Sequence, residues 1–222
     1  SNKADIYFNL EDYENALNDY SKVIDLQPED PDNFIDRSEC YVALENYDNA
    51  LIDVSKAIEV SSAENKAIYL NNRADFYEEN DELELALIDY AAVIEVSKVD
   101  NYSKARAINN RALIFKDQGN YEKAINEFTY VIDNFSDVLN EQGLALALDN
   151  RADAYFALED YENALNDYSK AIELQPEDPD YLIDRSDCYV ALEDYDNALI
   201  DRSKAIDVAM DKETYFTYRA DF

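Results

Sequence analysis

Arginine and a carboxylate recur together along this chain at a fixed spacing. Five arginines, one in each repeat after the first, are followed by an acid sixteen residues later, and the first repeat carries Lys3 and Asp19 instead. A guanidinium can clamp a carboxylate or phosphate of a ligand through two parallel hydrogen bonds, or it can join two helices of its own protein. We favour the second interpretation, because the acid recurs as regularly as the base. The predicted bridges are Arg37–Asp53, Arg73–Asp89, Arg111–Glu127, Arg151–Asp167 and Arg185–Asp201.

A second column of carboxylates stands two residues after each of these bases. Residues that keep one position on successive helices can form a line of negative charge that attracts a cationic ligand. They can equally form an ordinary solvated face, and the residues alone leave both interpretations open. The column is interrupted once, at Leu113, and comprises Asp5, Glu39, Asp75, Asp153 and Asp187, with Asp221 following near the end.

Side chains that commonly carry catalysis or hold metals are scarce. The chain has no histidine, and it lacks a glycine-rich phosphate loop, a nucleophile elbow and a calcium-binding loop. Cys40 and Cys188 are isolated and occupy equivalent copies of a repeat, so we expect two small buried residues rather than a disulfide or a metal site. A catalytic pair of carboxylates would interrupt a repeated face. We therefore predict no enzyme, no metal site and no cofactor.

The composition indicates a folded, helical chain with a strong negative charge. Only 2 glycines and 4 prolines occur in 222 residues, too few for the turns of a sheet protein, while 47% of the residues are hydrophobic. The formal net charge of −32 argues against binding to nucleic acid, which requires a basic face, and to anionic membranes. Protein partners with basic side chains are the class that this charge favours.

The elements that position these side chains repeat along the whole sequence. Around six alanines, apolar residues recur three, four and seven positions apart, which is typical of amphipathic helices. An aromatic residue stands nine positions before each alanine, and a small residue stands twelve before it. We expect each stretch to be two antiparallel helices joined by a short turn. The alanines are Ala16, Ala50, Ala86, Ala124, Ala164 and Ala198.

The spacing of these alanines predicts the domain organisation. Successive spacings are 34, 36, 38, 40 and 34 residues, and "YENALNDYSKVIDLQPEDPD" from Tyr13 returns almost unchanged from Tyr161. The fifth repeat therefore copies the first, 148 residues later. We predict an excerpt of a longer array whose end helices carry no polar cap. The expected single array covers 1–222, with units at about 1–30, 31–62, 63–98, 99–136, 137–178 and 179–210 and a partial unit at 211–222.

The pattern resembles the tetratricopeptide repeat. That family has a 34-residue helix–turn–helix unit with small residues, aromatics and a proline at matching places, and the resemblance covers the whole chain. Proline is missing from the ends of the longer units. The resemblance implies an all-α solenoid of about 13 helices wound into a right-handed superhelix. The usual tryptophan is replaced by Phe34, Leu70, Ile108, Leu148 or Leu182.

In that family the first helices line a concave groove that holds the ligand. The resemblance therefore implies that the second column of acids faces a ligand, together with neighbouring apolar and amide side chains. We predict a protein–protein interaction scaffold that binds a basic or aliphatic peptide segment in an acidic groove. The predicted groove residues are Asp5, Ile35, Glu39, Asn71, Asp75, Asn109, Asp153, Ile183 and Asp187.

An alternative from a different class stays open. A long array of repeats can separate two attachment points, and uncapped end helices can stack on one another. A structural spacer, or an array that self-associates end to end without a peptide groove, therefore also fits the sequence. Salt separates the two, because binding of a basic segment weakens as ionic strength rises. We expect no membrane insertion, since no apolar run is long enough. Low cysteine content favours the cytoplasm.

Overall fold

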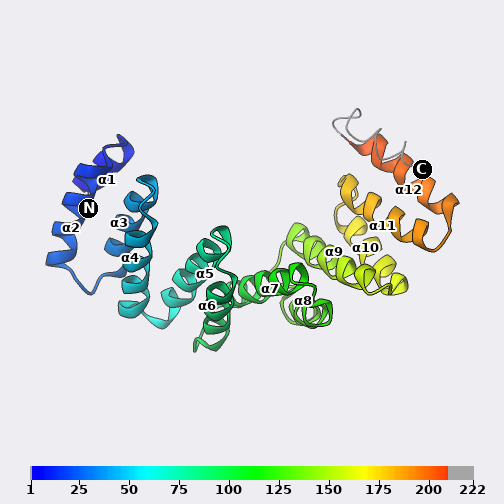
Figure 1. Ribbon diagram of the computed structural model, residues 1–222, viewed down its shortest axis with the longest axis horizontal. Helices are drawn as coiled ribbons and strands as arrows, with labels where there is room; N and C mark the ends of the chain where they lie inside the picture. The colour runs from blue at the N-terminus through cyan, green and yellow to red at the C-terminus, as the bar shows by residue number, and fades with distance from the viewer. Residues whose placement is uncertain (1, 210–222) are drawn as a thin grey trace. The chain divides into compact units, whose positions relative to one another are not determined.

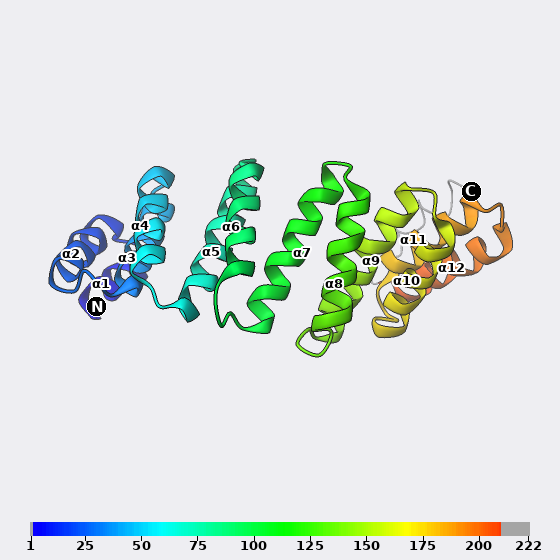
Figure 2. The same cartoon turned by 90° about the horizontal axis from the view of Figure 1, so that it is seen from below.

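The computed structural model describes residues 2–209, which form helices and short connections (Figures 1 and 2). No strand occurs within this range, so the predicted all-α solenoid class is confirmed. The predicted seventh unit at 211–222, which accounts for the thirteenth expected helix, lies outside the described residues. The twelve described helices are α1 (Asn2–Asn9), α2 (Tyr13–Leu26), α3 (Pro31–Ala43), α4 (Tyr47–Val60), α5 (Ala63–Glu79), α6 (Leu83–Glu95), α7 (Asn101–Asp117), α8 (Tyr121–Phe135), α9 (Glu141–Ala157), α10 (Tyr161–Leu174), α11 (Pro179–Ala191) and α12 (Tyr195–Val208).

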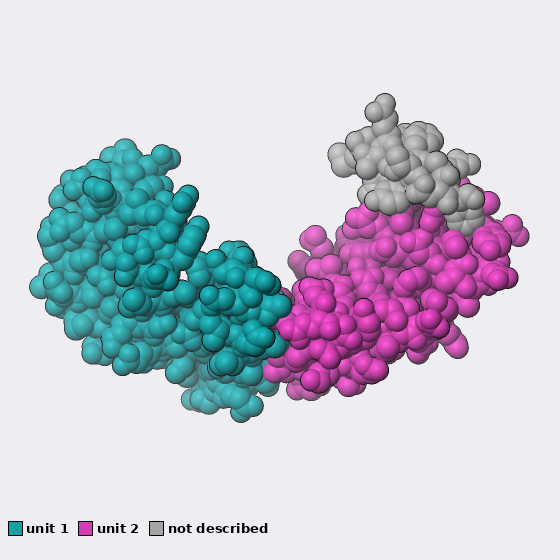
Figure 3. All heavy atoms as spheres, in the orientation of Figure 1, with its two compact units in different colours: residues 1–107 teal, residues 108–222 magenta. Residues whose placement is uncertain are grey.

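The chain divides into two compact units, residues 1–107 and residues 108–222, and the division falls within α7 (Figure 3). Inside each unit the helices pair as hairpins: α1 with α2, α3 with α4 and α5 with α6 in the first, and α9 with α10 and α11 with α12 in the second. Each hairpin lies within one of the ranges expected for a repeat unit. The longer repeats lengthen their first helix, because α5, α7 and α9 have 17 residues where α3 and α11 have 13.

A left-handed residue closes the turn inside every hairpin. The amide that follows it donates back to the carbonyl five residues earlier, as Asp160 N does to Tyr155 O at 2.9 Å, which is the long bond of a Schellman motif. The side chain of Asp160 then caps the next helix by accepting from the Asn163 amide. One motif thus ends the first helix and starts the second. The left-handed residues are Glu11, Glu45, Asp81, Gly119, Glu159 and Glu193.

Small residues at the helix contacts let the two helices of a hairpin approach closely. All six repeated alanines are buried, and large side chains such as Tyr90 and Phe128 fill the space beside them and are fully buried themselves. Cys40 and Cys188 are free thiols and are also buried. The repeated positions therefore form a core in each hairpin, and they fix which helix faces remain for other contacts.

Candidate functional site

The five expected arginine–acid pairs join the two helices of each hairpin. In the α9–α10 hairpin, Arg151 Nε and Nη2 donate to the two oxygens of Asp167 at 2.6 and 2.9 Å. The Asp167 side chain is 1% exposed, so the pair is shielded from water. Lys3 and Asp19 make the corresponding contact at 2.9 Å in the first hairpin. The other four pairs are Arg37–Asp53, Arg73–Asp89, Arg111–Glu127 and Arg185–Asp201, each with its closest contact at 2.7 Å.

Four of these arginines also contact the preceding hairpin. Arg151 Nη1 donates to Thr129 Oγ1 of α8 at 3.0 Å, and its guanidinium lies 6.0 Å from the centre of the Tyr155 ring. The guanidinium donors of Arg151 are thus bound within the protein itself, which is the arrangement expected of a structural bridge. Sequence reasoning missed the hydroxyl partners, although Ser or Thr stands five residues after the alanine in the preceding repeat. The other three contacts are Arg37 to Ser21, Arg73 to Ser55 and Arg185 to Ser169.

Four acids of the second column find donors within their own hairpins. Tyr168 donates its hydroxyl to Asp153 at 2.7 Å, and the donor stands fifteen residues after the acid. At the interruption the equivalent residue is Phe128, which packs with Leu113, so the acid and the hydroxyl are absent together. This matched change was readable in the sequence and was missed. The equivalent contacts are Tyr20 to Asp5 at 2.8 Å, Tyr90 to Asp75 at 2.7 Å and Arg202 to Asp187 at 2.6 Å.

The change Tyr168→Phe tests whether this column is structural. It removes the donor to Asp153 and keeps the ring, so we expect the free energy of unfolding to fall by about 1 kcal/mol in urea denaturation. Tyr161→Phe is the control, because the Tyr161 hydroxyl makes no hydrogen bond to the described part of the chain. An equal loss from both changes would show that the Asp153 contact contributes nothing.

Two of the predicted groove residues are buried, because neighbouring hairpins cover them. Asn71 is 1% exposed, and its amide donates to the Ser103 carbonyl of α7 at 3.1 Å. Ile183 is 8% exposed and belongs to a core cluster with Leu148 of α9. Both lie where the first helix of an adjacent hairpin packs, a contact that one repeat alone does not reveal. Of the remaining predicted groove residues, Glu39 is exposed and Asp5, Ile35, Asp75, Asn109, Asp153 and Asp187 are half-buried.

Basic side chains already lie against several acids of this column. Asp153 accepts from Lys116 Nζ at 2.8 Å, and Asp75 accepts from Arg106, both in addition to a tyrosine hydroxyl. Asp187 contacts Arg202. These carboxylates are therefore partly neutralised by the protein itself, and they are poorer attractors of a cationic ligand than the sequence predicted.

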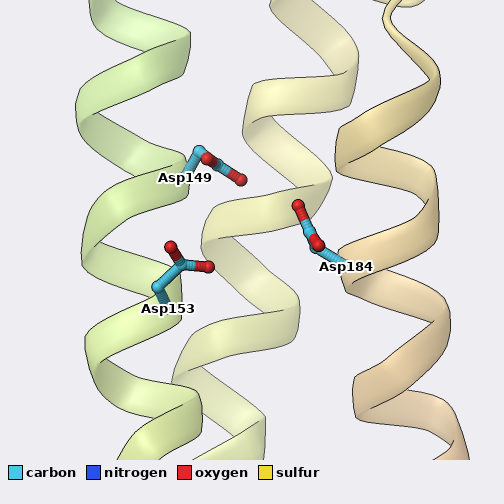
Figure 4. A group of neighbouring side chains, drawn as sticks. All are labelled: Asp149, Asp153 and Asp184. Atoms are coloured by element: carbon cyan, nitrogen blue, oxygen red, sulfur yellow. The ribbon is translucent and has the colours of Figure 1, made fainter.

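Three acids in the second compact unit lie close together, and only one of them, Asp153, has a basic side chain in contact in the described part of the chain. Asp149 and Asp153 of α9 and Asp184 of α11 offer carboxylate oxygens that all lie within 4.8 Å of one another (Figure 4). Burial, with the charges of Asp153 and Asp184, raises the pKa of Asp149 to about 8. Burial, with the charges of Asp153 and Asp187, raises the pKa of Asp184 to about 7. We call Asp149, Asp153 and Asp184 the three-acid cluster.

The three-acid cluster has a weaker counterpart in the first compact unit. Burial, with the charges of Asp5 and Glu39, raises the pKa of Asp36 to about 6, and Asp36 stands 148 residues before Asp184. Carboxylate oxygens suit a hard cation, but in the cluster the Lys116 ammonium already lies against Asp153. The arrangement therefore concentrates carboxyl groups on the first helices α3, α9 and α11.

No described helix combines the length and apolar character that crossing a membrane requires.

Comparisons with known proteins identify a single family along the chain. Models of the tetratricopeptide repeat match residues 1–30, 103–177 and 150–207. No curated protein matches the sequence. Among solved structures, the chain is similar to the C-terminal part of a tetratricopeptide repeat protein from Cytophaga hutchinsonii, with a TM-score of 0.71, 20% identity and coverage of 93% of this chain and 78% of that one.

Two further structures share the fold. YrrB, described as a tetratricopeptide repeat protein with an unusual peptide-binding site, has a TM-score of 0.67 and 16% identity, covering 90% of this chain and 97% of YrrB. The Cut9–Hcn1 hetero-tetramer of the APC/C gives a TM-score of 0.64 and 14% identity, covering 96% of this chain and 40% of the matched one. At these identities the likeness concerns the fold.

Proposed function

Because this chain belongs to the tetratricopeptide repeat family, we propose that it is a protein-interaction scaffold that binds a partner segment carrying basic side chains. The proposed contact surface is the exposed face of the first helices in each compact unit. Such repeats commonly present extended binding surfaces, and we propose no catalytic role. The proposal rests chiefly on one observation, the crowding of carboxylates around Asp36 and Asp184.

Asp36 and Asp184 have no basic side chain in direct contact with their carboxylates among the described residues. Neither carboxylate makes a hydrogen bond or an ion pair within residues 2–209, and burial, with the charges of neighbouring acids, raises the pKa of both. A lysine or arginine of a partner would relieve this repulsion and stabilise both deprotonated acids. Because Asp75, Asp153 and Asp187 already have basic neighbours, we assign the main electrostatic contact to Asp36, Glu39 and Asp184.

A capture experiment tests this assignment. The chain is fixed on beads and incubated with lysate of its source at low and high salt, and bound proteins are identified by mass spectrometry. We expect Asp36→Asn with Asp184→Asn to reduce low-salt capture about tenfold, since two charge contacts are lost. The control changes exposed acids of α2 and α10, Asp25→Asn with Glu173→Gln, and removes the same charge.

Two other outcomes of the capture experiment would contradict the proposal. A partner retained equally by the variant, by the control and at high salt would place the interface on another surface. Recovery of the chain's own parent protein alone would favour end-to-end self-association and the spacer function, because stacking of apolar helix faces is insensitive to salt.

A further inference from the structure

We propose that a pocket between α3, α4 and α5 binds an aliphatic side chain of the partner segment, and that an adjacent lysine or arginine of that segment contacts Glu39. This inference rests on the proposed function and names its anchor point. All the residues that form the pocket lie in the first compact unit.

The pocket has the size and lining of an apolar side-chain site. Its volume is about 190 Å³, and its apolar wall comes from Ile35 and Val42 of α3, Leu51 and Val54 of α4 and Phe76 of α5. An apolar cavity of about 150 Å³ is large enough for benzene, so a leucine, isoleucine or methionine side chain fits here. Val42 is 44% exposed, which leaves the pocket open to an incoming chain.

The pocket lies in the hairpin that keeps the acid of the second column but lacks its donor. In four other hairpins the acid of the second column meets a tyrosine or arginine fifteen residues later. In α3 and α4 these positions hold Glu39 and Val54, and valine has no donor. Glu39 is exposed and makes no hydrogen bond or ion pair with any described residue. The missing side chain thus leaves an apolar space with an uncompensated carboxylate at its edge.

The copy of this hairpin, 148 residues later, shows what normally fills the space. Helices α4 and α12 read "YDNALIDVSKAIEV" and "YDNALIDRSKAIDV", so they differ at two positions, and Arg202 stands where α4 has Val54. Arg202 donates to Asp187 at 2.6 Å and to Ser186 Oγ at 3.0 Å. Where α4 has a valine and leaves Glu39 without a donor, α12 thus has an arginine that binds the equivalent acid.

The negative charge of Glu39 favours a basic residue beside the aliphatic residue that enters the pocket. Arg73 also lines the pocket, but its guanidinium is bound to Asp89 and Ser55, so Glu39 supplies the available charge. A basic residue beside an aliphatic one satisfies both parts of the site, whereas an acidic neighbour would meet Glu39 and a net charge of −32.

A titration followed by methyl NMR tests the pocket with defined probes. The probes are three capped hexapeptides: Gly-Ser-Leu-Lys-Ser-Gly, the same with alanine for leucine, and the same with glutamate for lysine. We expect the leucine–lysine peptide to shift the methyl signals of Ile35, Val42 and Leu51 at millimolar concentration, and to bind about tenfold more tightly than either control. Absence of these shifts, or equal binding of all three, would overturn the proposal.

Two variants separate the pocket from the carboxylate. Val54→Arg copies Arg202 onto α4, so it should keep the fold by circular dichroism and weaken the leucine–lysine peptide at least tenfold. Glu39→Gln should weaken the preference for lysine over glutamate and retain the preference for leucine over alanine. Unchanged binding by Val54→Arg would contradict the proposal.

The lysate experiment keeps this inference distinguishable from the proposed function. Suppose that no hexapeptide binds, while the double variant Asp36→Asn with Asp184→Asn still loses the lysate partner. The proposed binding at the pocket would then be wrong, and the proposed acidic contact surface would be supported. If the hexapeptide binds as expected but capture ignores the acidic variant, the pocket stands and the wider acidic surface is wrong.

Discussion

Replacing Arg151 by alanine is expected to lower the free energy of unfolding of the second compact unit by about 3–5 kcal/mol. The change leaves the Asp167 carboxylate, which is 1% exposed, without its two guanidinium hydrogen bonds. It also removes the contact from α9 to Thr129 of α8. A buried charge that loses its partner costs more than the pair contributed, because the desolvation of the remaining ion is no longer offset. Urea denaturation and hydrogen exchange of the α9 and α10 amides measure the loss.

Two controls make this prediction specific. Lys170 lies 3.7 Å from the same Asp167 but is 49% exposed, so Lys170→Ala should cost less than about 1 kcal/mol. Arg151→Met combined with Asp167→Leu removes both charges and should recover most of the lost stability. If Arg151→Ala instead keeps full stability and abolishes partner binding, the arginines act as a ligand clamp and the structural interpretation is wrong.

The sequence predicted the hairpins well, because their determinants lie within one repeat. Ala164, the aromatic nine residues before it and the Glu159–Asp160 turn recur at fixed offsets, and each offset reports a contact inside a hairpin. The arginine–acid pairs belong to the same class. Arg151 and Asp167 recur together because they face each other across two helices whose relation is the same in every repeat.

Exposure and crowding were less predictable, because they depend on contacts between hairpins. Asn71 and Ile183 occupy first-helix positions that looked open within one repeat, yet α7 covers Asn71 and α9 packs against Ile183. Asp149 was missed for a related reason. The residues at its repeat position vary, and its effect arises only when α11 brings Asp184 against α9.

The three-acid cluster should make the second compact unit less stable as pH rises from about 4 to about 8. In the unfolded chain an aspartate has a pKa near 3.9, whereas the folded pKa of Asp149 is about 8 and that of Asp184 about 7. Between these limits the folded state binds more protons than the unfolded state, so the free energy of unfolding falls with pH and levels off near pH 8. We expect a total loss of several kcal/mol, because each pH unit by which a folded pKa exceeds the unfolded one costs up to about 1.4 kcal/mol.

Asp149→Asn isolates this effect, because an asparagine stays neutral at every pH tested. Above pH 6 the ordinary carboxylates are deprotonated in both states and contribute no slope, and the Cys188 thiol, with a pKa of about 12, stays protonated. Urea denaturation at pH 4, 6 and 8.5 should therefore show the variant equal to the wild type at pH 4 and more stable at pH 8.5, while the exposed control Glu173→Gln keeps the wild-type slope. If Asp149→Asn retains that slope, then the Lys116 ammonium leaves Asp149 deprotonated at neutral pH in spite of burial and the neighbouring acids. The negative charge offered to a partner would then be larger than the crowding of these acids implies.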